Sequence, residues 1–220
     1  MQHADAHEVS DETLLRDLSL ASIGVEMLNN PANPLNYVGP MGYMNIGPIA
    51  ASALEVFAHA TATYGKPAWN IEAVDAGGEP HPVIESTVVN MPFGDLKEFY
   101  REDLPEDAPR LLVVAPMSGH YATLLRSTVV SLLPDCEVYI TDWHNARDIP
   151  VSAGKFDVED YTLYTVDFMR RLGPDIHVIA VCQPVPLVLA ATAYLAEEDP
   201  DAQPRSLTLI GGPVDPDATP

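Results

Sequence analysis

The stretch HVIAVCQPVPLVLAATAYLAEE, residues 177–198, decides the fold class of this chain. Residues 177–182 form a short apolar run rich in β-branched side chains, which predicts a buried strand, whereas 184–198 predicts a helix. The same alternation recurs on both sides, in predicted strands 111–117, 136–143 and 206–212 and predicted helices 121–133 and 157–173. Apolar strands that alternate with such helices predict an α/β protein with a doubly wound, mostly parallel sheet covered on both faces.

The chain before residue 111 has a different pattern. Residues 83–91 and 95–102 predict short strands, whereas the apolar residues nearer the N-terminus have helical spacing and are interrupted by Pro and Gly. We therefore expect an N-terminal helical extension over residues 1–75 and the first part of the α/β domain over residues 76–220.

Charge and cysteine content narrow the possible partners. The 220 residues include 32 Asp and Glu against 11 Lys and Arg, a formal net charge of −21. This surface charge argues against nucleic acid as a partner. No apolar run approaches the roughly 18 residues of a membrane span. The first residues resemble no secretory signal, and the two cysteines lack C-x-x-C spacing, so we expect a cytoplasmic protein with free thiols.

The end of the predicted strand 177–182 carries the strongest candidate for catalysis. A nucleophile elbow places Ser or Cys at a sharp turn from strand to helix, and Cys182 stands at this point, between Ala180 and Pro184. The helix macrodipole at that position favours a thiolate. The backbone N–H of Gln183 would then be one oxyanion donor, and Ser118 or Gly119, after strand 111–117, would supply a second. The alternative for Cys182 is a small buried apolar residue.

Other polar side chains follow neighbouring strands. His120 comes after the strand at 111–117, and Asp142 and Trp143 end the strand at 136–143, so all three are candidates for the wall of a pocket. Each also has a structural interpretation, as a residue of a helix start, a loop or the core. His3 and His7 have the spacing of a metal pair but lack a third ligand, so we expect neither a metal site nor a cofactor.

Five motifs lie in order along the chain: YVGPMGYMNIGPIAA (37–51), LLVVAPMSGHYATLLRSTV (111–129), YITDWHNAR (139–147), HVIAVCQPVPLVLAA (177–191) and SLTLIGGPVD (206–215). Through these motifs the chain resembles the N-terminal half of the intracellular polyhydroxybutyrate (polyhydroxyalkanoate) depolymerases of bacteria. The resemblance implies an α/β-hydrolase fold and hydrolysis of the ester bonds of amorphous storage polyester. It also implies that the cysteine of the VCQP motif, here Cys182, is the nucleophile.

The resemblance leads to further expectations. In this fold the catalytic acid and histidine follow the nucleophile, yet no histidine follows Cys182 here. We therefore expect a sheet that is incomplete at the C-terminus and an isolated chain of doubtful activity. Expected partners are the polyhydroxybutyrate granule or its oligomers, with a second copy or the missing C-terminal half completing the fold, and the expected location is the granule surface. The alternatives are a polyhydroxyalkanoate synthase-like acyltransferase and a non-catalytic granule-binding chain.

Overall fold

The computed structural model describes residues 52–58, 65–117, 121–215 and 217. The chain divides into two compact units, residues 1–65 and 66–220. In the first unit, residues 52–58 are helical. The prediction of a helical extension over 1–75 otherwise falls mostly outside the described residues and stays a prediction. No helix in the described part of the chain has the length and apolar character needed to cross a bilayer.

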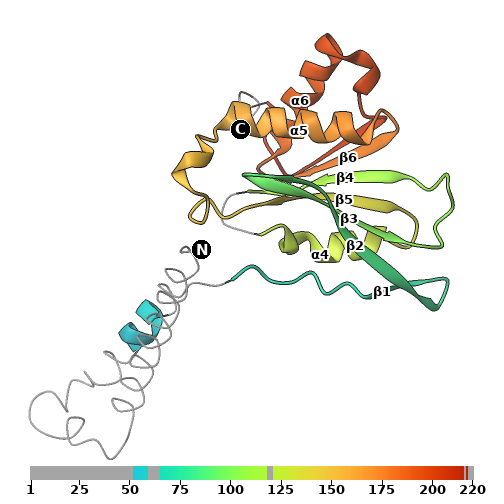
Figure 1. Cartoon of the computed structure of the whole chain (residues 1–220), viewed down its shortest axis with the longest axis horizontal. Helices are drawn as coiled ribbons and strands as arrows, with labels where there is room; N and C mark the ends of the chain where they lie inside the picture. The colour runs from blue at the N-terminus through green and yellow to red at the C-terminus, as the bar shows by residue number, and fades with distance from the viewer. Residues whose placement is uncertain (1–51, 59–64, 118–120, 216, 218–220) are drawn as a thin grey trace, which may run out of the picture. The chain divides into compact units, whose positions relative to one another are not determined.

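The second unit contains one sheet and the helices that flank it (Figure 1). Its strands are β1 (Ala73–Ala76), β2 (Glu79–Met91), β3 (Gly94–Arg101), β4 (Arg110–Val114), β5 (Glu137–Trp143), β6 (Ile176–Val181) and β7 (Ser206–Ile210). Its α-helices are α4 (Arg126–Leu132), α5 (Val158–Leu172) and α6 (Val185–Glu198), and its 3₁₀ turns are η2 (Ala122–Leu125), η3 (Val151–Ala153) and η4 (Pro200–Ala202).

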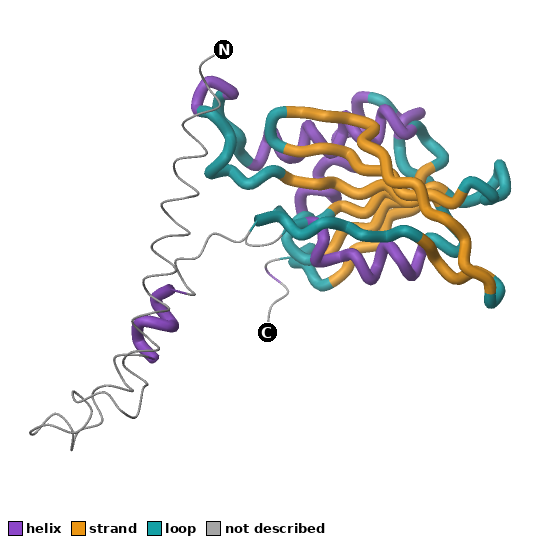
Figure 2. Tube along the Cα trace, turned by 60° about the horizontal axis from the view of Figure 1, so that its bottom comes forward, coloured by secondary structure: helices purple, strands orange, loops and turns teal. Residues whose placement is uncertain are grey.

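The seven strands are ordered β1-β2-β3-β5-β4-β6-β7. Strands β5, β4, β6 and β7 pair in parallel, whereas the pairs β1–β2, β2–β3 and β3–β5 are antiparallel. Only β1 and β3 therefore run against the other five strands. Figure 2 shows the strands, in orange, as a twisted sheet with helices on both sides. This arrangement confirms the predicted α/β-hydrolase-like fold with a mostly parallel sheet.

Helices cover both faces of the sheet, as predicted. In Figure 1, α5 and α6 lie on one side of the sheet and α4 lies on the other. Side chains alternate along each strand, so Leu112 and Val114 of β4 pack in the cluster that includes α5 and α6, whereas Val113 packs in the cluster that includes α4. Trp69, which precedes β1, belongs to the second cluster and packs on Phe99 with ring centroids 5.0 Å apart.

Three predicted elements have different ends in the structure, each for a local reason. Strand 111–117 ends at Val114, because the next backbone N–H bonds to a side chain instead of a neighbouring strand. The helix predicted over 121–133 begins as the 3₁₀ turn η2, since Tyr121 provides no side-chain cap. Strand 83–91 starts earlier, at Glu79, and includes Pro80 and Pro82, which pair with the short outer strand β1.

Candidate active site

Cys182 lies at the turn that joins β6 to α6. It has a φ of +66°, a left-handed conformation that is strained for any residue with a Cβ. Pro184 follows with a φ of −72° and starts the helix without needing an N–H. The Cys182 side chain is exposed and its thiol is free. This backbone strain and exposure match the geometry of a nucleophile elbow and contradict the alternative that Cys182 is a buried core residue.

Two backbone hydrogen bonds hold the strained residue. The Cys182 N–H donates to the carbonyl of Ile210, the last residue of β7, at 2.7 Å. The Cys182 carbonyl accepts from the N–H of Val185 at 3.2 Å, in the first turn of α6. Gly212 lies close by, and a Cβ there would stand 2.4 Å from the Cys182 oxygen. The end of β7 therefore supports the elbow from the neighbouring strand.

The residue after Cys182 connects the elbow to the end of β4. The side-chain oxygen Oε1 of Gln183 accepts a hydrogen bond from the backbone N–H of Met117 at 3.0 Å. Met117 is half-buried and packs on the core beneath α5 and α6. Ser118, Gly119 and His120 come next and lie outside the described residues, so their roles as oxyanion donors and pocket residue stay predictions.

Three side chains form hydrogen bonds with the backbone of Ala115, the residue that follows β4. The N–H of Ala115 donates to Thr141 Oγ1 at 2.9 Å, and its carbonyl accepts from Trp143 Nε1 at 2.9 Å and from Tyr161 Oη at 3.2 Å. Thr141 and Trp143 belong to β5 and Tyr161 to α5. Burial raises the pKa of Tyr161, which keeps its hydroxyl protonated as a donor. Ala115 begins the loop that follows β4, called the β4 loop below, and the core therefore fixes the start of this loop.

Trp143 lies in the core beside α5. Its side chain is only 3% exposed, and its ring centroid is 4.3 Å from that of Tyr161 and 5.9 Å from that of Phe156. The indole contributes to the site through its bond to the Ala115 carbonyl. Its predicted place in a pocket wall stays a prediction.

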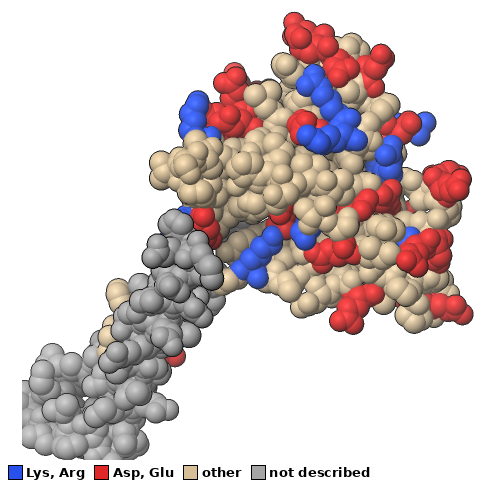
Figure 3. Space-filling view, in the orientation of Figure 1, with Lys and Arg blue, Asp and Glu red and all other residues tan. Residues whose placement is uncertain are grey.

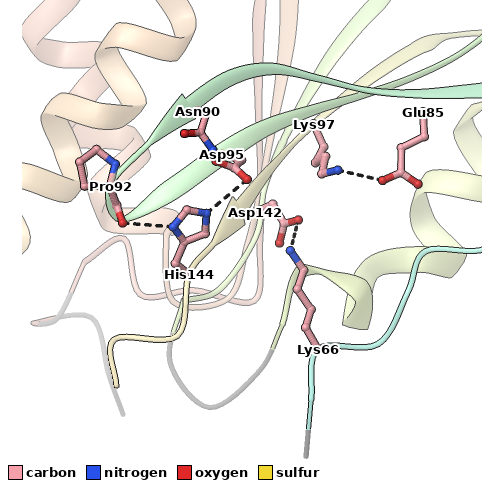
Figure 4. Close-up of polar contacts among 8 residues, drawn as sticks. All are labelled: Lys66, Glu85, Asn90, Pro92, Asp95, Lys97, Asp142 and His144. Atoms are coloured by element: carbon pink, nitrogen blue, oxygen red, sulfur yellow. Dashed lines mark hydrogen bonds and ion pairs between the residues drawn. The ribbon is translucent and has the colours of Figure 1, made fainter. Parts of the chain in front are cut away.

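Asp142 points to the opposite face of the sheet from Trp143. Its side chain is fully buried and forms an ion pair with Lys66, the first residue of the second unit. Figure 4 shows the two side chains pointing toward one another at the end of β5. The other carboxylate oxygen, Oδ1, has no hydrogen-bond partner among the described residues. The ion pair ties the segment before β1 to the sheet, and a pocket role for Asp142 stays a prediction.

The histidines in the described ranges have partners away from Cys182. His144 Nδ1 donates to the Pro92 carbonyl at 3.1 Å, and its Nε2 lies 3.2 Å from Asp95, toward the hairpin of β2 and β3 (Figure 4). His177 contacts Ser206 Oγ at 2.7 Å at the start of β6, the far end of that strand from Cys182. His81 pairs with Asp103 at the start of β2. Within these ranges Cys182, the candidate nucleophile, therefore has no adjacent imidazole.

Several residues that shape the site were not found from the sequence. Gly212, Ile210, Thr141 and Tyr161 act through contacts between segments that lie far apart in the chain. The Gly-Gly pair that follows the β7 strand was the one local signal, since adjacent glycines after a strand mark a tight turn or a close approach.

No protein-family model matches the chain, and no curated protein matches it in sequence. Solved structures similar to it include three esterases. Brefeldin A esterase, a bacterial homologue of human hormone-sensitive lipase, is 15% identical with a TM-score of 0.42, over 69% of this chain and 44% of the esterase. A bacterial heroin esterase is 12% identical with a TM-score of 0.43, over 77% of this chain and 52% of the esterase. A hyperthermophilic esterase from the archaeon Pyrobaculum calidifontis is 13% identical with a TM-score of 0.42, over 89% of this chain and 58% of the esterase. The chain thus spans about half the length of these structures.

Proposed function

We propose that this chain carries the nucleophile of a carboxylic ester hydrolase that acts on amorphous polyhydroxybutyrate. The observation that carries the proposal is the exposed Cys182 thiol at φ +66°, at the turn where a parallel strand enters a helix. A strained residue that the surrounding structure holds in place is typical of a catalytic position. The hydrogen bonds from the Cys182 N–H to the Ile210 carbonyl and from the Val185 N–H to the Cys182 carbonyl provide that support.

The reaction follows from the position of the thiol. The Cys182 thiolate attacks the ester carbonyl carbon, and the resulting oxyanion accepts hydrogen bonds from the Gln183 N–H and from the predicted donor at Ser118 or Gly119. Collapse of this intermediate breaks the C–O bond, and the alkoxide takes up the proton that the base removed from the Cys182 thiol and leaves as the hydroxyl end of the remaining polymer. Water then hydrolyses the thioester on Cys182 and releases the hydroxyacyl group as an acid.

The group that deprotonates Cys182 is proposed to lie outside the described residues. His81, His144 and His177 are all bonded elsewhere. A further segment of the kind that the resemblance implies, or a second copy, would bring such a base to the exposed thiol.

A neutral polyester is the substrate that best fits the surface. Asp and Glu side chains are spread over much of the face shown in Figure 3, and the net charge of −21 disfavours anionic polymers and lipid headgroups. Apolar side chains are exposed near the elbow, with Ile210 at 49% and Val214 at 55%. The motif resemblance supports polyhydroxybutyrate specifically. We therefore place the protein at the surface of storage granules in the cytoplasm.

The test uses amorphous polyhydroxybutyrate granules and three forms of the protein: the parent, Cys182→Ala and Cys136→Ala. Cys136 is a matched control because burial, followed by the nearby Asp135 charge, raises its pKa and makes it a poor nucleophile. Release of 3-hydroxybutyrate should fall on the order of a thousandfold in Cys182→Ala and stay near the parent rate in Cys136→Ala. Mass spectrometry of quenched reactions should find a hydroxybutyryl thioester on the peptide that contains Cys182.

Three results would contradict the proposal. One is undiminished release by Cys182→Ala. Another is granule binding with no ester cleavage even when the segment or second copy proposed to supply the base is present, which would favour a non-catalytic granule-binding chain. The third is polymer growth from hydroxybutyryl-CoA, which would favour a synthase-like acyltransferase.

A further inference from the structure

We propose that Gln183 is a positioning residue whose side chain holds Met117, in the loop that follows β4, at a fixed distance from the nucleophile. The inference rests on the proposed function, which assigns the Gln183 backbone N–H to the oxyanion. The structure assigns its side chain a second task, because Oε1 accepts the Met117 N–H at 3.0 Å. A single residue thereby joins the elbow to the loop that leads toward the predicted second donor.

The connection is needed because the loop has only one other described anchor. Ala115 is fixed by Thr141, Trp143 and Tyr161, but Pro116 has no N–H with which to bond. Met117 is therefore the next residue with a backbone N–H, and this N–H bonds to the elbow and not to the sheet. Two anchors two residues apart therefore fix the backbone from Ala115 to Met117.

The chemistry explains why such a link would matter. Two oxyanion donors stabilise a transition state only when both lie at hydrogen-bond distance from one developing charge. The Gln183 N–H belongs to the elbow, whereas the predicted second donor belongs to the β4 loop. A shift of about 1 Å between them costs far more in rate than in substrate binding. The hydrogen bond from the Met117 N–H to the Gln183 side chain links the elbow directly to the β4 loop.

The experiment compares the parent with Gln183→Glu and Gln183→Met. Glutamate keeps a side-chain oxygen that can accept the Met117 N–H, whereas methionine keeps the length of the side chain and lacks the acceptor. Each variant keeps the backbone N–H of residue 183. Two quantities are measured: hydrogen exchange at the Met117 amide, and kcat and KM for hydroxybutyrate oligomers. The kinetics of Gln183→Glu are taken at the plateau of its own pH profile, because a carboxylate disfavours a neighbouring thiolate.

We expect Gln183→Met to lose protection at the Met117 amide and to lower kcat about tenfold with little change in KM. Gln183→Glu should keep that protection and recover most of kcat. Unchanged protection in Gln183→Met would overturn the link itself. Lost protection with an unchanged kcat would overturn its role in positioning. A parent protein that stays inactive on every ester, even with the segment or second copy proposed to supply the base, would overturn the proposed function, and the exchange measurement would still decide whether Gln183 holds Met117.

Discussion

Gly212 lies directly against the carbonyl of Cys182. A Cβ on residue 212 would stand 2.4 Å from that oxygen and 2.3 Å from the Cβ of Val185, distances that real Cβ atoms do not adopt. The backbone after β7 can therefore approach the elbow only because residue 212 has no side chain. This approach places Ile210 where its carbonyl accepts the N–H of Cys182.

Replacing this glycine tests that close approach. We expect Gly212→Ala to lower the free energy of unfolding by about 1–3 kcal/mol, because backbone must move to relieve the contact, and to reduce ester hydrolysis as the elbow shifts. Urea denaturation measures the first effect. Gly65→Ala is the matched control, since a Cβ there meets nothing within 4 Å. Equal stability of the two variants would show that the elbow tolerates a side chain beside it.

The strain at Cys182 should be measurable as stability. At φ +66° a Cβ is unfavourable, so Cys182→Gly should be more stable than Cys182→Ala by about 1 kcal/mol, although both lack the thiol. The comparison is made by thermal and urea unfolding. At Cys136, where φ is not positive, the order should reverse and Gly should be less stable than Ala. The same order at both positions would contradict backbone strain at the elbow.

Much of the fold was predictable because its signals are local. Strands β5 and β6 and helices α5 and α6 begin and end within a residue or two of the predicted bounds, since apolar periodicity and punctuation by Pro and Gly mark such elements. The position of Cys182 at a strand-to-helix turn was predictable for the same reason. Its left-handed φ agrees with that prediction.

The contacts that support the site were not predictable, because they join residues far apart in the chain. Lys66 pairs with Asp142 and the Met117 N–H meets Gln183, and no local pattern encodes either distance. Asp142 and Trp143 illustrate the difficulty: both end one strand, yet one side chain pairs with Lys66 on one face while the other enters the aromatic core on the opposite face.

The buried ion pair between Lys66 and Asp142 should be asymmetric in its response to mutation. Asp142 is fully buried, whereas the Lys66 side chain is 36% exposed. Lys66→Met leaves a buried carboxylate without its counter-charge and should cost about 2 kcal/mol of unfolding free energy, discounted for the exposure of the lysine. Asp142→Asn should cost less, because the lysine can turn to solvent. The double variant should be more stable than Lys66→Met alone, and additive losses in urea denaturation would contradict a direct coupling.

Glu137 should make stability depend on pH. Burial, as the largest cause, raises the pKa of this carboxyl above its ordinary 4.5, while the hydrogen bond from Tyr139 opposes the shift. The folded protein therefore holds this proton at pH values where the unfolded chain has released it, so the contribution of Glu137 to stability falls as the pH rises above about 4.5. Glu137→Gln removes that loss. Its stability relative to the parent should increase from pH 4 to pH 7 in urea denaturation, and a flat or falling difference would refute the assignment.

The bond from Cys182 to Ile210 also has a consequence for synthesis on the ribosome. The acceptor that holds the elbow belongs to a strand that is translated after α6. A nascent chain that has already emerged through α6 therefore has its thiol and its helix but not the carbonyl that keeps Cys182 in its strained conformation. The strained backbone conformation at Cys182 therefore gains this support only once β7 has been synthesised and has paired with β6.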